Sequence, residues 1–212
     1  MLLALTTWVA PAAAQDPLDN ASCVECHRQK GRAFNLKAYE GSVHAKSACV
    51  ECHSDVQSIP HAEKLKPVRC GKCHNDAVEA FNRSIHAELA RKGLPDTPTC
   101  ASCHGSHEIY PASDVRSRVN HLKLDATCLK CHANLKITRR HPGMASAEFA
   151  AGYRATVHGR GVHLSGLVVA ATCSDCHGHH DMRPKGDATS SVNPARIPTT
   201  CSRCHVGIFE EW

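Results

Sequence analysis

The sequence predicts a mainly α-helical fold with much irregular structure, in which short helices and loops wrap around bound groups and little or no sheet forms. Three observations predict this class. The 212 residues include only 4 Phe, 2 Trp and 3 Tyr, so the large side chains of an ordinary core are scarce. The 14 Cys and 17 His instead point to cross-links, metal or a covalent cofactor as the stabilising element. No segment shows a convincing alternation of apolar and polar residues, the pattern typical of half-buried strands.

The N-terminal segment 1–14 (MLLALTTWVAPAAA) contains no charged side chain and resembles a secretory signal that lacks its basic start. Its apolar stretch is followed by small residues at 12–14, which suit cleavage before Gln15. A buried N-terminal helix is the alternative, and Pro11 disfavours it. We therefore expect an incomplete signal segment at 1–14, a mature region at 15–212 and export to the periplasm or the cell surface.

Every Cys belongs to a C-x-x-C-H motif, and the motif occurs seven times; we number the motifs 1 to 7 in chain order. This is the attachment motif of c-type haem. Two thiols three positions apart lie on one helical turn, so each can form a thioether to a porphyrin vinyl group, and the adjacent His lies under the iron. The predicted attachment residues are Cys23, Cys26, Cys49, Cys52, Cys70, Cys73, Cys100, Cys103, Cys128, Cys131, Cys173, Cys176, Cys201 and Cys204. The predicted proximal iron ligands are His27, His53, His74, His104, His132, His177 and His205.

Three other uses of these Cys fit the pattern less well. A disulfide scaffold leaves the His after every second Cys unexplained. Zinc sites with four thiolates need the C-x-x-C units in pairs, and seven is an odd number. Iron–sulfur clusters need a third nearby Cys, which no motif has. The sequence therefore predicts seven covalently bound haem c groups with their iron.

The sixth position of each iron needs a further ligand, and the His outside the motifs are the main candidates. Only Met144 and Met182 are available as Met ligands in the mature region, so we expect mostly bis-His ligation and comparatively reducing potentials. Three of these His end one repeated pattern: an aromatic residue, two variable residues, Ser or Thr, a β-branched residue, and then His44, His86 or His158. On a continuous helix the aromatic and β-branched residues would share a face for the porphyrin.

A second recurrence follows motifs 4 and 6, where His107 and His180 each lie three residues after the motif His. His61 after motif 2 is a looser equivalent. The predicted second ligands are therefore His44, His61, His86, His107, His158 and His180. His121 aligns with Pro194 and is a weaker candidate, and we expect solvent exposure for His141, His163 and His179.

The motif spacing predicts a mature region built of haem pairs at 23–53, 70–104 and 128–177, followed by a truncated unit from 201. We expect one helical turn at each motif and longer helices over 77–92 and 146–158. The links 58–67, 95–99 and 183–200 are rich in Pro and polar residues, which predicts irregular structure.

The end of the sequence repeats the start of an earlier unit. Trp212 follows His205 at the spacing by which Phe81 follows His74, so it would open another ligand segment. We therefore expect the chain to be part of a longer cytochrome with eight or more haems.

Charge and packing density limit the possible functions. The formal net charge of +5 falls to about −2 when each oxidised haem contributes about −1, so nucleic-acid binding is not expected. No run of 18 apolar residues occurs, so we expect no transmembrane helix in this chain. A compact chain of this length has a radius of gyration of ~16 Å, which places seven haem centres roughly 18 Å apart. Electron transfer between haems is the expected consequence.

The chain resembles the multihaem c-type cytochromes with doubled C-x-x-C-H motifs, over nearly all of 23–212. The resemblance implies extracytoplasmic electron transfer in an anaerobic-type respiratory chain. The implied partners are redox proteins, such as a membrane quinol oxidase module and a terminal reductase or extracellular acceptor. Two alternatives remain: a multihaem reductase of the nitrite, hydroxylamine or tetrathionate type with one open haem, and a conductive filament subunit. Several such enzymes replace a motif His with Lys, and because every motif here ends in His we favour an electron carrier over an enzyme.

Overall fold

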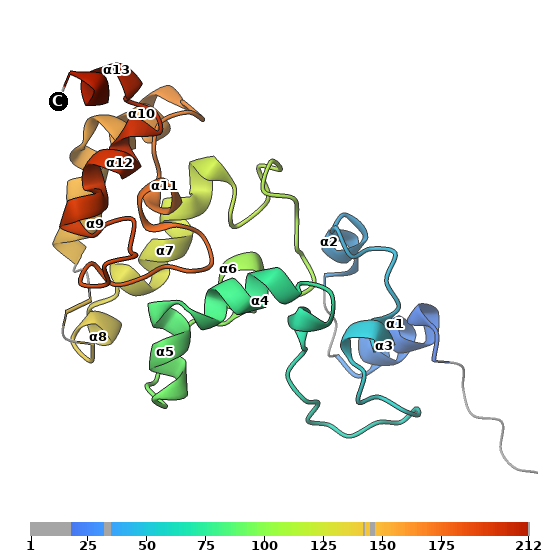
Figure 1. The fold of residues 1–212 in the computed structure, drawn as a ribbon. Coiled ribbons are helices and arrows are strands. Elements are labelled where there is room, and N and C mark those ends of the chain that lie inside the picture. Colours follow the sequence, from blue (N-terminus) through green and yellow to red (C-terminus); the bar gives the residue numbers. More distant parts are fainter. Residues whose placement is uncertain (1–17, 32–34, 142, 145–146, 212) are drawn as a thin grey trace, which may run out of the picture. The chain divides into compact units, whose positions relative to one another are not determined.

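The computed structural model describes residues 18–31, 35–141, 143–144 and 147–211. Within them the chain forms thirteen α-helices and three short 3-10 helices joined by long irregular segments, and it forms no strand (Figure 1). The predicted fold class is confirmed. The signal-like segment 1–14 and Trp212 lie outside the described residues.

The chain divides into two compact units. The first comprises Met1–Leu36 and Lys46–Arg69, and it contains α1 (Asn20–Gln29) and α3 (Cys49–Cys52). The second comprises Lys37–Ala45 and Cys70–Trp212, and α2 (Leu36–Glu40) joins the two in sequence. The second unit holds η1 (Cys70–Lys72), α4 (Asn75–Asn82), α5 (Ile85–Arg91), α6 (Cys100–His104), η2 (His121–Lys123), α7 (Leu124–His132), α8 (Leu135–Thr138), α9 (Ala147–Ala155), α10 (Val157–Ser165), α11 (Cys173–His177), η3 (Pro194–Arg196), α12 (Ile197–Ser202) and α13 (Val206–Glu210).

In the first unit a single side chain ties the two helices together. Asn20, in the first turn of α1, donates from Nδ2 to the carbonyl of Ser47 at 3.0 Å. Its Oδ1 accepts from the backbone N–H of Cys49 at 2.8 Å, at the start of α3. Asp19 caps α1 by accepting from the N–H of Ser22 at 2.7 Å, as an Asp N-cap does. These bonds fix motif 1 relative to motif 2.

The prediction of a single helix over 77–92 is wrong, because the structure has two helices there with a break at Ser84. The α4 helix ends at Asn82, and α5 begins at Ile85 with Ser84 as its N-cap. The Ser84 hydroxyl accepts from the N–H of Ala87 at 3.2 Å, which competes with continuing the helix. Gly93 lies just beyond α5, with a left-handed φ of 71°.

The helix predicted over 146–158 is broken in the same way at Thr156. The α9 helix ends at Ala155, and Thr156 caps α10 by accepting from the N–H of Gly159 at 3.1 Å. A Cβ at Gly159 would lie 2.2 Å from the carbonyl oxygen of Tyr153, so only glycine fits this corner. In these two copies the Ser or Thr of the repeated pattern is therefore a helix N-cap, and the aromatic and β-branched residues lie on separate helices.

The two long loops after motifs 4 and 6 share one set of internal hydrogen bonds. Asn120 donates from Nδ2 to the carbonyl of Ala112, and Asn193 donates likewise to that of Lys185. The hydroxyls of Ser117 and Ser190 each donate to a carbonyl seven residues earlier. The link 183–200 is thus only partly irregular, because η3 and the start of α12 lie within it. The links 58–67 and 95–99 contain no helix or strand, as expected.

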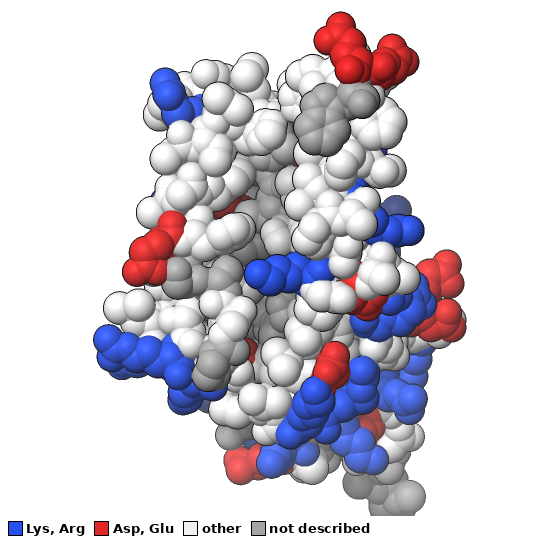
Figure 2. Space-filling view, turned by 60° about the vertical axis from the view of Figure 1, so that its left-hand side comes forward, with Lys and Arg blue, Asp and Glu red and all other residues white. Residues whose placement is uncertain are grey.

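The described chain buries few apolar side chains. Val56, Ala87 and Val162 are its buried apolar residues, whereas the buried polar residues are Ser84, Ser117, Asn120, Asp125, Thr172 and Ser190. Large apolar side chains are instead exposed on α10, at 167–169 and on α13. In Figure 2 the upper part of the visible face, where α10 and α13 lie, is mostly uncharged. Since exposed apolar surface normally marks a binding site, these surfaces suit contact with a further group.

Candidate metal centres

Each C-x-x-C-H motif begins in a helical turn, as the sequence predicts. Motif 1 lies within α1, motif 2 forms α3, and motif 3 starts with η1. Motifs 4 and 6 form α6 and α11, motif 5 ends α7, and motif 7 begins at the end of α12. All fourteen Cys side chains are free thiols and none forms a disulfide. The two thiols and the His of a motif are therefore available on one turn.

Attachment cysteines of different motifs meet within each unit. The thiols of Cys23 and Cys49 are neighbours in the first unit, and those of Cys128 and Cys173 in the second. Burial raises the pKa of the Cys49 thiol. The hydrogen bond to Cys173 and burial raise the pKa of Cys128. These contacts place motif 1 beside motif 2 and motif 5 beside motif 6.

Five motif His face a second imidazole from a distant part of the chain. The distances between ring centroids are 5.9 Å for His27–His61, 6.0 Å for His44–His74, 6.2 Å for His86–His132, 5.9 Å for His104–His180 and 5.9 Å for His158–His205. Each pair combines one predicted proximal ligand with one predicted second ligand.

The spacing of these rings fits an iron atom between them. Two metal–nitrogen bonds of ~2.0 Å, with ~1.1 Å from each nitrogen to its ring centre, place the centroids roughly 6.2 Å apart. Each centre offers two protein nitrogens, and a porphyrin supplies four more. No cluster of three or more His, Cys, Asp or Glu that could hold a bare metal ion occurs in the described part of the chain. The donor set of each pair therefore fits a haem iron.

A Ser or Thr hydroxyl lies two residues before each second His of the repeated pattern, and in two copies it caps a helix. His86 and His158 each lie two residues after the capping hydroxyl, in the first turn of α5 and α10. The hydroxyl of Ser42 accepts from the N–H of His44 at 3.2 Å, so the same residue type fixes the third His. Each of these His faces the first motif of the following haem pair rather than a motif of its own pair.

The other two second His are fixed differently. His61 is hydrogen-bonded through Nδ1 to the carbonyl of Ala62 at 2.8 Å, which leaves Nε2 for a metal. His180 follows the turn at Gly178, which ends α11 with a positive φ of 79°. Both face a motif that precedes them in the chain.

Burial favours the neutral imidazole that a metal requires. Burial lowers the pKa of His86, His104, His132 and His177 below the usual value of 6.5. For the first three of these, a nearby second imidazole lowers the pKa further. A neutral imidazole keeps the lone pair with which it can bind iron, and burial removes the competition from protons.

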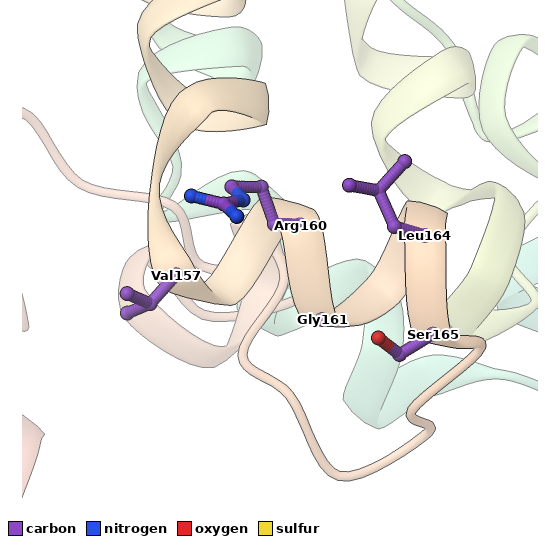
Figure 3. Close-up of a pocket in the computed structure, with 5 residues that line it drawn as sticks. All are labelled: Val157, Arg160, Gly161, Leu164 and Ser165. Atoms are coloured by element: carbon purple, nitrogen blue, oxygen red, sulfur yellow. The ribbon is translucent and has the colours of Figure 1, made fainter.

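The surface of α10 is open and carries both apolar and polar side chains. Val157 and Leu164 are 79 % and 77 % exposed, and they line a hollow together with Arg160, Gly161 and Ser165 (Figure 3). The hollow has a volume of about 330 Å³.

Three predicted proximal or second ligands have other surroundings. His107 lies edge-on to Tyr39, with ring centroids 6.4 Å apart. The Nδ1 atom of His53 is buried. His177 faces the ring of Phe149 at 6.5 Å.

The remaining His have structural contacts. The Nε2 of His121 lies 2.7 Å from the carbonyl oxygen of Ala170, and that of His141 lies 3.0 Å from that of Pro95. His179 is exposed, as expected. The expected exposure is wrong for His141, whose side chain is only 9 % exposed because this contact holds it.

A buried charge cluster in the second unit has no counterpart among the sequence motifs. Asp125 is 2 % exposed and accepts from Nε and Nη2 of Arg154 at 3.1 and 2.9 Å. The Nε2 of His163 lies 3.0 Å from the same carboxylate oxygen, and His163 is exposed, as expected. No local pattern could have revealed the cluster, because its members come from α7, α9 and α10. It clamps α9 and α10 onto the helix that carries motif 5.

Comparisons with known proteins agree with the motif analysis. The chain is 26 % identical to a high-molecular-weight cytochrome c of Nitratidesulfovibrio vulgaris, over 87 % of this chain and 34 % of that protein. It is 28 % identical to the C-type polyheme cytochrome OmcB of two Geobacter sulfurreducens strains, over 63 % of this chain and 20 % of that protein. The chain thus spans about a third or less of the length of these relatives. No family model and no solved structure matches it.

These relatives confirm the prediction of a multihaem c-type cytochrome with covalently bound haem c and iron. Within the described residues, no helix is both long and apolar enough to cross a bilayer.

Proposed function

We propose that this chain carries electrons outside the cytoplasm through seven closely spaced c-type haems, most of them with two His ligands. Haem c supplies a one-electron iron couple whose potential depends on its axial ligands and on burial. The protein holds each haem by two thioethers and by the imidazole of the same motif. The observation that carries this proposal is the set of five imidazole pairs with centroids 5.9–6.2 Å apart.

The proposed ligand pairs are the five pairs that face one another in the structure. The second ligands are then His61, His44, His86, His180 and His158, for motifs 1, 3, 5, 4 and 7 respectively. We retain His107 as a sixth second ligand on the strength of the loop recurrence it shares with His180. Two protein nitrogens on an iron leave no position for a substrate, which favours electron transfer over catalysis at these centres.

Contacts between attachment sites support rapid transfer. The neighbouring thiols of Cys128 and Cys173 mean that the haems of motifs 5 and 6 would be attached at neighbouring points. The thiols of Cys23 and Cys49 do the same for motifs 1 and 2. Porphyrins attached at such points would lie close together, which supports rapid electron transfer within each pair.

The setting of this transfer is part of the proposal. The signal-like segment 1–14 and the covalent haems favour the periplasm or the cell surface. We propose an anaerobic-type respiratory chain, with a membrane quinol oxidase module as electron donor and a terminal reductase or an extracellular acceptor downstream. Bis-His ligation suits this place because it gives comparatively low potentials.

The test is maturation of the chain in a host that attaches haem c, followed by mass spectrometry and electron paramagnetic resonance. We expect a mass that corresponds to seven covalent haems and stepwise reduction in a potentiometric titration. His86→Ala should add one high-spin ferric haem to the spectrum of the unchanged protein. The matched control is His121→Ala, which should add none because His121 is bound to the Ala170 carbonyl. A protein without covalent haem would refute the proposal, and an unchanged spectrum for His86→Ala would refute that ligand.

A further inference from the structure

Two distant segments that each carry a second His meet through one backbone hydrogen bond, which we call the α5 junction. Ile85, the first residue of α5, donates its N–H to the carbonyl of Met182 at 2.9 Å. His86 is the next residue after Ile85, and His180 lies two residues before Met182. The start of α5 and the loop after α11 therefore lie side by side, although they are far apart in the sequence (Figure 1).

The same arrangement occurs a second time in this unit. Val43 donates its N–H to the carbonyl of Ile109 at 2.9 Å. His44 follows Val43 directly, and His107 lies two residues before Ile109, so the offsets are identical in both copies. A bond that recurs with the same offsets in two copies of a repeat is a built feature rather than a chance contact.

The loop that brings His107 or His180 to its junction is held at both ends. Gly105 and Gly178 end α6 and α11 with positive φ values of 91° and 79°. At the far end, the hydroxyls of Thr127 and Thr200 each donate to a carbonyl nine residues earlier, at 2.6 and 2.7 Å. A displacement at the junction is therefore passed on to the loop His instead of being absorbed along the loop.

The two imidazoles at the α5 junction face different motifs. His86 faces His132 of motif 5, with ring centroids 6.2 Å apart. His180 faces His104 of motif 4 at 5.9 Å. Both distances fit an iron between the rings, so one backbone bond lies between the second ligands of two haems.

We propose that the α5 junction positions His86 and His180 together, so that the haems of motifs 4 and 5 keep or lose their second ligands as a pair. A hydrogen bond between two ordered segments restrains both of them, and its loss releases both. The N–H of Ile85 acts only through the two imidazoles, so Ile85 is a positioning residue. This inference rests on the proposed function only in that His86 and His180 must be iron ligands.

Ile85→Pro removes this N–H and should leave the helix intact. Proline is favoured as the first residue of a helix, and the preceding Ser84 already has an extended ψ of 158°. Cyanide is the probe, added to the ferric holoprotein and followed by electron paramagnetic resonance, because it competes with a loosened imidazole. We expect roughly three- to tenfold tighter cyanide binding at two haems. Their low-spin signals should be the two that are lost in His86→Ala and His180→Ala.

Two matched variants separate the bond from other effects of the substitution. Ile85→Ala shortens the same side chain but keeps the N–H, so it should bind cyanide like the unchanged protein. Val157→Pro places proline at the equivalent first residue of α10, whose N–H donates to no loop carbonyl within the described residues. This variant should also bind cyanide like the unchanged protein.

The possible results separate the junction from the proposed function. If neither His86→Ala nor His180→Ala alters a haem in the fully loaded protein, the proposed ligands are refuted, and the junction with them. If each alters one haem but Ile85→Pro loosens fewer than two, the junction alone is overturned. An effect of the same size in Ile85→Ala or Val157→Pro would also overturn it, since the side chain or the proline itself would then be the cause.

Hydrogen exchange decides the question if Ile85→Pro does not fold. The amide of Ile85 should be protected in the unchanged holoprotein and should exchange faster in His180→Ala, which releases the loop that carries Met182. An Ile85 amide that exchanges freely in the unchanged protein, or at the same rate in both proteins, would overturn the junction.

Discussion

Removal of the Ser84 hydroxyl should loosen His86, the proposed iron ligand two residues away. Ser84 is 1 % exposed, and its hydroxyl accepts from the N–H of Ala87, which is itself only 4 % exposed. An N-cap Ser is worth ~1 kcal/mol, with a range of roughly 0.5–2 kcal/mol. The buried N–H left without its acceptor adds a desolvation cost, which places Ser84→Ala near ~2 kcal/mol.

That cost falls on the first turn of α5, which presents His86 toward His132. If the turn frays before the rest of the protein, ~2 kcal/mol corresponds to a weakening of the His86–iron bond by up to about thirtyfold. An added ligand that competes with His86 should then bind correspondingly more tightly. The assay is a cyanide titration of the ferric holoprotein, followed by electron paramagnetic resonance, together with denaturant unfolding.

The matched control is Ser84→Thr, which keeps a capping hydroxyl and should behave like the unchanged protein. Cyanide affinity and unfolding midpoint that are the same in Ser84→Ala as in Ser84→Thr would refute the reasoning. A loss of stability without any change in cyanide affinity would show that the cap supports the fold but does not position His86.

Three further predictions follow from single residues. Gly159→Ala should destabilise the holoprotein by roughly 1–3 kcal/mol in denaturant unfolding, because the new Cβ would lie 2.2 Å from the Tyr153 carbonyl oxygen. Asp125→Asn should increase the rate of hydrogen exchange in α9 and α10, since it removes the carboxylate that holds Arg154; exchange confined to other helices would contradict this. Hydrogen bonds from Arg116 lower the pKa of Asp114 from 3.8 in the unfolded chain to about 2 in the folded protein. The ionised Asp114 therefore stabilises the fold fully above the unfolded pKa, and this stabilisation is lost as the pH falls through the folded pKa. Asp114→Asn should therefore lower the stability at neutral pH and make the acid unfolding curve less steep between these two values, while the two proteins become equally stable below the folded value.

The sequence was sufficient for the chemistry of the motifs and for finding the His that face a motif His in the structure. The two Cys of each motif are three positions apart, which corresponds to one helical turn. The structure has a helical turn at each motif. The repeated pattern indicated His44, His86 and His158, and each of them faces a motif His. Local patterns are informative in this chain because the attachment chemistry itself is local.

The partner of each second His could not be predicted, because it depends on long-range packing. His180 follows motif 6 directly, yet it faces His104 of motif 4. The helix break at Thr156 differs from the predicted single helix, although a Ser or Thr in every copy was the available signal. Asp125 and Arg154 meet only through the packing of α7 against α9, which no periodicity encodes.

Some second His face a motif in the next haem pair, and this affects how the chain can be truncated or shortened by internal deletion. His86 faces the motif that follows its own pair, and His158 does the same one pair later, so each would serve that motif in the proposed ligand set. Deletion of one haem pair at its sequence boundaries would leave the second His before the deletion without its iron. It would also leave the iron after the deletion without its second His. Successive pairs are therefore interdependent, because a His of one pair faces a motif of the next. Shortened versions of this cytochrome should therefore be designed with a replacement His at the new junction.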